Sequence, residues 1–189
     1  MSIPCRTFTD RRGSVGHPLE PVPELILGQR TLAWIAVTAD ASATTNAVLE
    51  AQPDTTYGTG ALRDLLAVFP DEAAVRRLAP DLTALTPLTS RDGIRGVIAT
   101  APASDPGSGY DFVSRFFAPA AGIPEDPVTG SAHTALAPYW SARLGHASLT
   151  GLQASTRTGL VRTTVHRDRV HLTGHAVTVL DGTLHHPPR

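Results

Sequence analysis

The stretch EDPVTGSAH, residues 125–133, combines residue types that could bind a small anion and move a proton. A loop of small residues that leads into a helix exposes free backbone N–H groups and the positive end of the helix dipole. Thr129 and Ser131 add hydroxyl donors, and Gly130 allows a ligand to come close to the backbone. We therefore expect a small carboxylate to bind here. The same residues could also act only as a helix cap.

Two carboxylates precede this helix and are candidates for acid/base chemistry. Asp126 lies between a prolyl turn and the start of the helix. A carboxyl group in a partly apolar cleft can have its pKa raised toward neutrality, as a general acid or base requires. Asp126 is therefore the candidate catalytic group. Glu125 is expected to accept backbone hydrogen bonds within the loop or to face solvent.

Histidine and cysteine patterns give weaker signals. His133 follows Ser131 by two residues, but GSAH differs from the G-x-S-x-G turn of serine hydrolases, and no acid partner is placed. His171 and His175 could share one strand face and ligate a metal, yet no third ligand can be named, so surface positions explain them better. Cys5 is the only cysteine, which excludes an internal disulfide. We expect neither a metal nor a cofactor.

Composition narrows the classes of partner and location. The 189 residues are 41% hydrophobic, enough to bury a substantial core, and carry a formal net charge of −1. This small net charge supplies neither a basic stripe that would bind nucleic acid nor a polybasic patch that would bind a membrane surface. The first residues lack the apolar region of a secretory signal, and nowhere do eighteen apolar residues run together. A cytoplasmic protein with a small-molecule partner is expected.

The candidate site must be positioned by a buried helix over residues 131–144. Gly145 is expected to end the helix, and Pro138 to kink it or set it close to a neighbouring element. Apolar residues cover most of its circumference, which favours a central position. These residues are Ala132, Ala135, Leu136, Tyr139, Trp140 and Leu144.

Strands are expected on either side of that helix. Residues 62–69 form an apolar run typical of a buried strand, and a short helix follows Pro70. Residues 93–103 are rich in β-branched side chains, and residues 110–119 alternate between two faces. The carboxy-terminal part reads as strands with His-Arg-Asp-Arg and Leu-Asp-Gly corners. The prediction is an α+β domain in which short antiparallel strands surround a central helix.

Three long segments carry a resemblance to a known family. They are YDFVSRFFAPAAGIPEDPVTGSAHTALAPYWSARLG, GLQASTRTGLVRTTVHRDRVHLTGHAVTVLDGTL and DLLAVFPDEAAVRRLAPDLTAL. Together they cover roughly residues 57–184. The chain resembles the PhzF-like isomerases of phenazine biosynthesis, mainly their carboxy-terminal half.

The resemblance implies a diaminopimelate-epimerase-like fold, in which each of two lobes wraps a mixed or antiparallel β-sheet around a central α-helix. Residues 57–189 would form the carboxy-terminal lobe, and residues 1–56 a remnant of a truncated first lobe. Such proteins move a proton between carbons of a small carboxylic acid without a cofactor, and the type member isomerises a dihydro-hydroxyanthranilate. By this likeness Asp126 would assist proton transfer. The carboxylate would be bound by Thr129, Gly130, Ser131 and Ala132.

The chain also departs from the family pattern in its amino-terminal part. No N-L-S-E-T-like stretch, which carries the family's principal glutamate, is present, and His17 is only a faint echo of a second motif, C-G-H-A-T. Whether the chain is an active isomerase is therefore open. The alternative is a catalytically inactive carboxylate-binding module. A missing lobe would leave apolar surface and sheet edges exposed, so we expect a homodimer, with residues 31–48 as the contact segment.

Overall fold

The computed structural model describes residues 29–30, 35–36, 49–91 and 93–175. Residues Glu24–Gly174 form one compact unit, to which all the elements below belong. A second unit, Met1–Pro23 with His175–Arg189, lies almost entirely outside the described residues. The segment 31–48, expected to mediate self-association, is described only at Ile35–Ala36.

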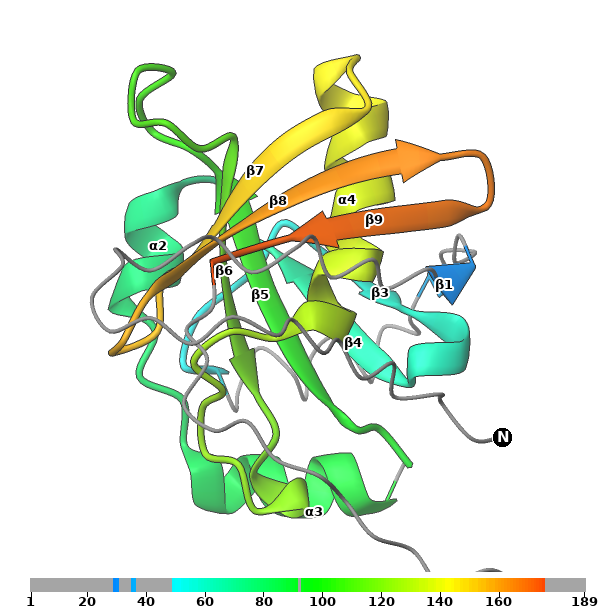
Figure 1. Cartoon of the computed structure of the whole chain (residues 1–189). Coiled ribbons are helices and arrows are strands. Elements are labelled where there is room, and N and C mark those ends of the chain that lie inside the picture. The colour runs from blue at the N-terminus through cyan, green and yellow to red at the C-terminus, as the bar shows by residue number, and fades with distance from the viewer. Residues whose placement is uncertain (1–28, 31–34, 37–48, 92, 176–189) are drawn as a thin grey trace, which may run out of the picture. The chain divides into compact units, whose positions relative to one another are not determined.

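One mixed sheet of nine strands organises the described part of the chain, in the order β1-β9-β8-β7-β6-β5-β4-β3-β2 (Figure 1). The pairs β4–β5 and β6–β7 are parallel, and the other neighbours are antiparallel. The strands are β1 (Gln29–Arg30), β2 (Ile35–Ala36), β3 (Thr55–Gly58), β4 (Asp64–Val68), β5 (Gly96–Pro102), β6 (Phe112–Phe117), β7 (Ser148–Gln153), β8 (Gly159–His166) and β9 (Arg169–Thr173).

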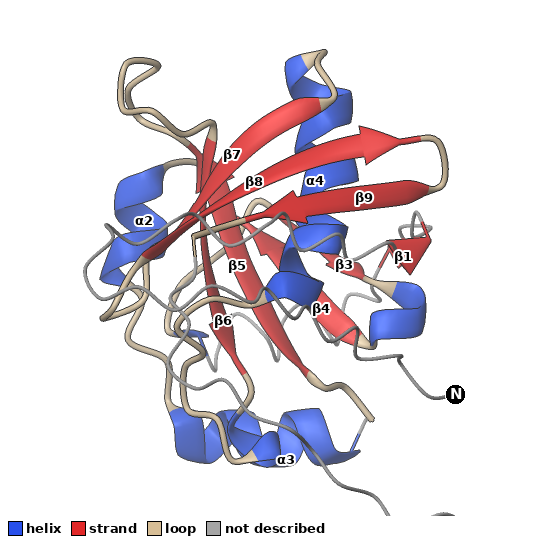
Figure 2. Ribbon diagram, viewed as in Figure 1, coloured by secondary structure: helices blue, strands red, loops and turns tan. Residues whose placement is uncertain are grey.

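The two edges of this sheet must lie near each other. β1 and β2 occupy opposite edges, yet only four residues separate Arg30 from Ile35 in the sequence. A chain extends at most about 3.6 Å per residue, so the two edge strands are no more than about 18 Å apart. The sheet is therefore strongly curved, and it wraps around helix α4 (Gly130–Leu144), as Figure 2 shows.

Helix α4 occupies the centre, as predicted. Leu136 is fully buried, and Trp140 stacks on Phe112 of β6 with ring centroids 6.0 Å apart. The Trp140 Nε1–H donates to the Thr100 hydroxyl over 3.0 Å, which satisfies the one polar atom of the indole. Leu144 is 38% exposed, so its expected burial is wrong: it lies in the last turn, where α4 leaves the sheet.

Gly145 ends the helix in the left-handed conformation, with φ of 79°, and its N–H donates to the Ser141 carbonyl.

Strand β6 separates two apolar layers, and the predicted alternation of its side chains is confirmed. Phe112 and Phe116 pack in the core that contains α4, whereas Val113 and Phe117 pack in the core on the other face. Helices α2 (Glu72–Arg77) and α3 (Leu82–Arg91) contribute Val75 and Leu85 to that second core. Since both faces are covered, β4 and β5 are buried almost throughout.

The two outer helices differ in how well the sequence predicted them. Helix α2 follows Pro70 as expected, and Asp71 caps it by accepting the Ala74 N–H over 2.7 Å. Helix α3 was not predicted, because Pro87 lies inside it and interrupts a helical pattern. Asp81, which accepts the Thr83 and Ala84 N–H groups, is the signal that could have located its start.

The expected boundary near residue 57 falls within β3, which pairs with β4 through Tyr57 and Leu66. The division into residues 1–56 and 57–189 stays a prediction. The His-Arg-Asp-Arg corner is confirmed as the turn between β8 and β9, where His166 and Arg169 are paired. The Leu-Asp-Gly corner lies outside the described residues.

Candidate functional site

The start of α4 lacks an ordinary side-chain cap. Thr129 is the N-cap residue in extended conformation, yet its side chain accepts no hydrogen bond from the first turn. Its hydroxyl instead donates to Asp126 Oδ2 over 2.5 Å. The N–H groups that open the helix, those of Gly130, Ser131 and Ala132, are therefore not capped by the residue whose type suggested a cap.

A buried glutamine that the sequence analysis missed holds this loop. Gln153 ends β7, is fully buried, and accepts the Thr129 N–H on Oε1 over 2.7 Å. Its Nε2 donates to the Asp126 carbonyl over 2.6 Å and to the Thr129 hydroxyl over 3.1 Å. The signal was available: in β7 Leu149, Gly151 and Gln153 share the buried face, so the glutamine is a polar residue at a core position.

Asp126 lies half-buried at the start of α4, where the sequence placed it. Its backbone N–H donates to the Phe116 carbonyl over 3.0 Å, so the loop is fixed to β6. Because one of its carboxyl oxygens accepts the Thr129 hydroxyl, the side chain is oriented toward the helix.

Glu125 does not behave as expected. Its two oxygens accept Arg115 Nε at 2.7 Å and Arg115 Nη2 at 3.0 Å, a bidentate ion pair. Its side chain is only 20% exposed. The expectation that Glu125 bonds to the loop backbone or faces solvent is therefore wrong. Its carboxylate is paired with Arg115, ten residues earlier on β6.

A second arginine, also missed, reaches the start of α4 from the sheet. Arg95 immediately precedes β5 and pairs with Asp64, the first residue of β4, through Nε at 2.9 Å and a short Nη2 contact. Its Nη1 donates to the Ser131 hydroxyl over 2.9 Å. The bond to Asp64 raises the pKa of Arg95, and the charge of Asp126 raises it further. Burial raises the pKa of Asp64, against the opposing effect of Arg95.

His133 is unsuited to the role of a base for Ser131. Its Nδ1 lies 2.8 Å from the Thr129 carbonyl, which can only accept, so Nδ1 carries the proton. Its Nε2 has no partner among the described residues and lies against Gly151, where an added Cβ would be only 3.0 Å away. Complete burial lowers the pKa of His133 to about 4. Ser131 bonds to Arg95 instead, so the structure gives no support for a serine nucleophile.

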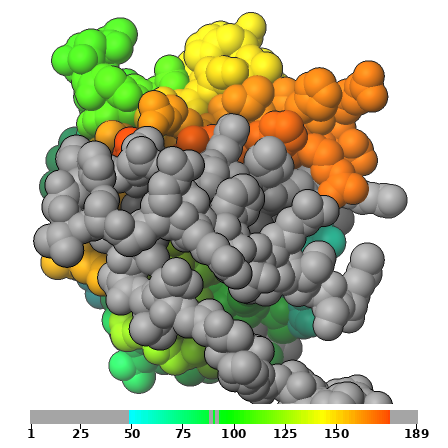
Figure 3. All heavy atoms as spheres, in the orientation of Figure 1, coloured from blue at the N-terminus to red at the C-terminus, as the bar shows by residue number. Residues whose placement is uncertain are grey.

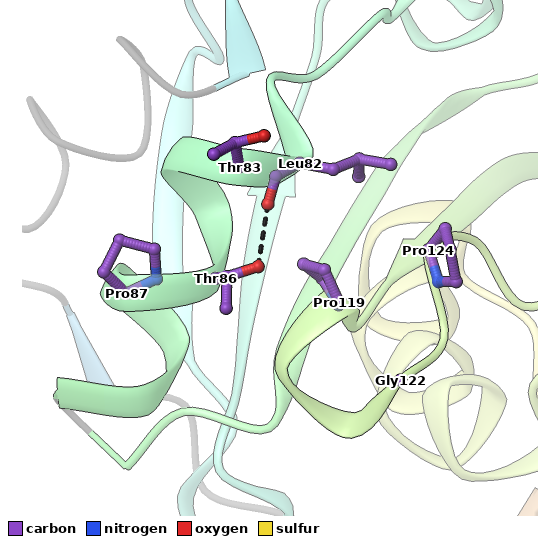
Figure 4. A pocket seen from close by; sticks show the side chains of 7 residues that line it. All are labelled: Leu82, Thr83, Thr86, Pro87, Pro119, Gly122 and Pro124. Carbon is purple, nitrogen blue, oxygen red and sulfur yellow. Dashed lines mark hydrogen bonds between the residues drawn. The ribbon is translucent and has the colours of Figure 1, made fainter.

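Other candidate features lie away from α4. A cavity of about 460 Å³ between α3 and the η2 turn (Pro119–Ala121) has a largely apolar lining, with the Thr86 hydroxyl turned to the Leu82 carbonyl (Figure 4). Neither this cavity nor two others among the described residues is lined by Thr129, Gly130 or Ser131, so carboxylate binding at these residues stays a prediction.

The described ranges lack the features of a metal centre and of a membrane-spanning helix. His, Cys, Asp and Glu side chains there form no group of three or more suited to a metal ion. The His171 ring lies 5.9 Å from that of His166 across the β8–β9 hairpin. None of the helices in the same ranges has the length and apolarity needed to span a bilayer.

Comparison with known proteins identifies the family. A family model described as phenazine biosynthesis-like protein matches residues 22–182. The chain belongs to the phenazine biosynthesis-like family. An uncharacterized isomerase of Pseudomonas aeruginosa is 48% identical over 125 residues, which are 66% of this chain and 45% of that protein. A second one from the same organism is 45% identical over 122 residues, which are 65% of this chain and 44% of that protein.

Solved structures of this phenazine biosynthesis-like family share the fold. A PhzF-family protein of Enterococcus faecalis superposes with a TM-score of 0.69 at 35% identity, covering 79% of this chain and 53% of that one. A putative PhzC/PhzF protein of Clostridium difficile gives 0.67 at 32% identity, with coverages of 86% and 57%. The expected diaminopimelate-epimerase-like α+β fold is confirmed. The chain spans about half the length of the relatives it matches.

Proposed function

We propose that this chain provides the carboxylate-binding half of an isomerase that moves a proton between carbons of a small carboxylic acid, in secondary-metabolite biosynthesis. One observation carries the proposal: α4 begins without a side-chain cap, while the Thr129 hydroxyl is engaged by Asp126. A helix start with free N–H groups and a nearby guanidinium suits an anion. A dihydro-hydroxyanthranilate is the proposed type of substrate, and no metal or organic cofactor takes part.

In this proposal the substrate carboxylate accepts hydrogen bonds from the start of α4. The backbone N–H groups of Gly130, Ser131 and Ala132 point along the helix axis and carry its partial positive charge. The Ser131 hydroxyl supplies a further donor. Thr129 contributes by orienting Asp126 instead of by capping the helix.

Asp126 is the proposed acid/base group of this half. It is half-buried, hydrogen-bonded by Thr129 and placed one turn before the carboxylate-binding N–H groups. Proton transfer between two carbons generally needs a second group on the substrate path. Because the chain spans about half the length of its relatives, we assign that group to residues outside the described ones. A homodimer in the cytoplasm completes the proposal.

The chain's partial coverage of its relatives also supports a second candidate function, which is not enzymatic. A chain that covers 45% of an isomerase could retain the carboxylate site and lack the second acid/base group. It would then be a carboxylate-binding module without activity. The two candidates differ in whether bound substrate exchanges a carbon-bound proton with solvent.

Deuterium uptake distinguishes them. The chain is incubated with a dihydro-hydroxyanthranilate in D₂O, and exchange and isomerisation are followed by NMR, with binding measured by calorimetry. Asp126→Asn is expected to lower exchange by about 100-fold or more, because it removes the acid/base group. Asp105→Asn is the matched control, since Asp105 is exposed in the β5–β6 loop that projects from the surface (Figure 3). Binding without exchange would favour the module, and no binding would contradict both candidates.

A further inference from the structure

Arg95 is held more rigidly than an ion pair at a surface would hold it. Its fork grips Asp64, whose side chain is fully buried, and its guanidinium lies 5.0 Å from the centroid of the Phe116 ring. Asp64 is itself fixed, because its N–H donates to the Thr59 hydroxyl and its carbonyl accepts from the same hydroxyl. Arg95 therefore has little freedom to adjust to what it contacts next.

Arg95 also contacts Ser131 in the first turn of α4. A guanidinium can only donate, so the Ser131 hydroxyl must accept this bond. A serine hydroxyl keeps one proton to donate, and no described side chain or carbonyl accepts it from Ser131. The Thr134 hydroxyl does not compete, because it donates to the Ser131 backbone carbonyl. The hydroxyl proton of Ser131 is thus directed away from Arg95 and left for a ligand.

We infer that Arg95 is a positioning residue for carboxylate recognition: with Asp64 as its anchor, it fixes the Ser131 hydroxyl as a donor toward the substrate carboxylate. The inference rests on the proposed function and adds a specificity rule to it. A carboxylate offers only acceptors and suits a donor-only hydroxyl beside uncapped N–H groups. A neutral carboxamide offers donors as well and gains less there.

A double-mutant cycle tests whether Arg95 acts through Ser131. The probe is anthranilate, with anthranilamide as its neutral counterpart, titrated by calorimetry into the wild-type chain, Arg95→Met, Ser131→Ala and the double variant. Each single change is expected to weaken anthranilate binding about tenfold or more, the usual effect of losing a hydrogen bond to a charged group. In the Ser131→Ala background, Arg95→Met should have less than about a twofold further effect.

Controls keep the result interpretable. Arg77→Met removes an exposed arginine of α2, a helix that packs on the face of the sheet opposite to α4, and should leave binding unchanged. Arg95→Met leaves the buried Asp64 unpaired, so the cycle is repeated with Asp64→Asn/Arg95→Met, which removes both charges. Anthranilamide should bind more weakly than anthranilate, and Arg95→Met should narrow that difference.

The outcomes separate the inference from the proposal beneath it. If Arg95→Met weakens binding equally with and without Ser131, Arg95 acts independently and the inference is wrong, although the carboxylate site stands. If Arg95→Met leaves anthranilate binding intact while Ser131→Ala weakens it, the inference about Arg95 is wrong but the proposed carboxylate site still stands. If the wild-type chain binds no anthranilate, or Ser131→Ala binds as well as wild type, the proposed carboxylate site fails and the inference fails with it.

Discussion

Two arginine–carboxylate pairs lie on opposite faces of strand β6, and they have different roles. Arg115 packs over the Phe117 ring at 4.8 Å and grips Glu125, whereas Arg95 packs over the Phe116 ring at 5.0 Å and grips Asp64. The neighbouring phenylalanines point to opposite faces. The same fork, ring and carboxylate thus occur twice, once beneath α2 and once beneath α4.

The two pairs differ in the groups that accept the remaining N–H donors of each guanidinium. Arg115 donates to the Leu78 carbonyl over 2.6 Å at the end of α2, and its side chain is only 13% exposed. Arg95 donates to the hydroxyl of Ser131, and its side chain is 38% exposed. Backbone carbonyls complete the first pair as a structural tie between a helix end and a loop. The second pair leaves a hydroxyl proton and a charged edge available beside the start of α4.

The largest expected effect on stability comes from breaking the Arg115–Glu125 ion pair. Arg115→Met should lower the free energy of unfolding by about 3–4 kcal/mol, because it strands a mostly buried Glu125 and frees carbonyls at the end of α2. Urea unfolding measures it, with Arg157→Met as the exposed control. Anthranilate binding by the folded fraction should be unchanged. A loss of binding without a loss of stability would reverse the roles assigned to the two pairs.

A buried imidazole with no carboxylate partner among the described residues extends the comparison. His133 is fully buried, and its pKa is lowered to about 4 from 6.5. The unfolded chain therefore binds the extra proton first, and stability is lost as the pH falls from 6.5 to about 4. The expected loss is about 1.4 kcal/mol for each pH unit, or about 3 kcal/mol in total.

Urea unfolding from pH 7 to pH 4 measures this slope in the wild-type chain and in His133→Gln, where it should be largely absent. His146→Gln is the control, because His146 is exposed and should leave the slope unchanged. An NMR titration of the His133 ring in the wild-type chain gives an independent reading. A ring that titrates near 6.5 would show that the imidazole is hydrated in the folded protein, contrary to its burial.

The smallest expected effect on stability comes from the anchor of the second pair. Asp64→Asn should change the free energy of unfolding by less than about 1 kcal/mol at pH 7, because the remaining Arg95 is exposed enough to be hydrated. Burial raises the pKa of Asp64 in the folded state, so its contribution is most favourable below the unfolded pKa and is lost as the pH rises through the folded value.

The pH dependence of unfolding between pH 3 and 7 should accordingly flatten in Asp64→Asn, and anthranilate binding should weaken. Glu125→Gln is the matched comparison from the first pair, and it should lower stability without changing binding. Equal stability losses in both variants would show that the two pairs do the same structural work.

The sequence predicted the elements well where a local pattern carries the information. Helix α4 was expected over residues 131–144 and spans Gly130–Leu144, and the alternation along β6 was correct. Asp126 was placed at the start of α4 because loop and helix are adjacent in the chain. Helix α3 was missed because Pro87 masks its pattern, and Leu144 was wrongly expected to be buried because periodicity does not show where a helix leaves its sheet.

By itself the sequence determined the central helix, the alternation of side chains along β6 and the neighbourhood of Asp126, because side-chain periodicity and capping act over three or four residues. Only the tertiary structure decided what these residues do there. The bonds from Gln153 to Thr129, from Arg95 to Asp64 and from Arg95 to Ser131 join residues 24 to 36 positions apart. Such contacts depend on which strands become neighbours in the curved sheet, and no local pattern encodes that pairing.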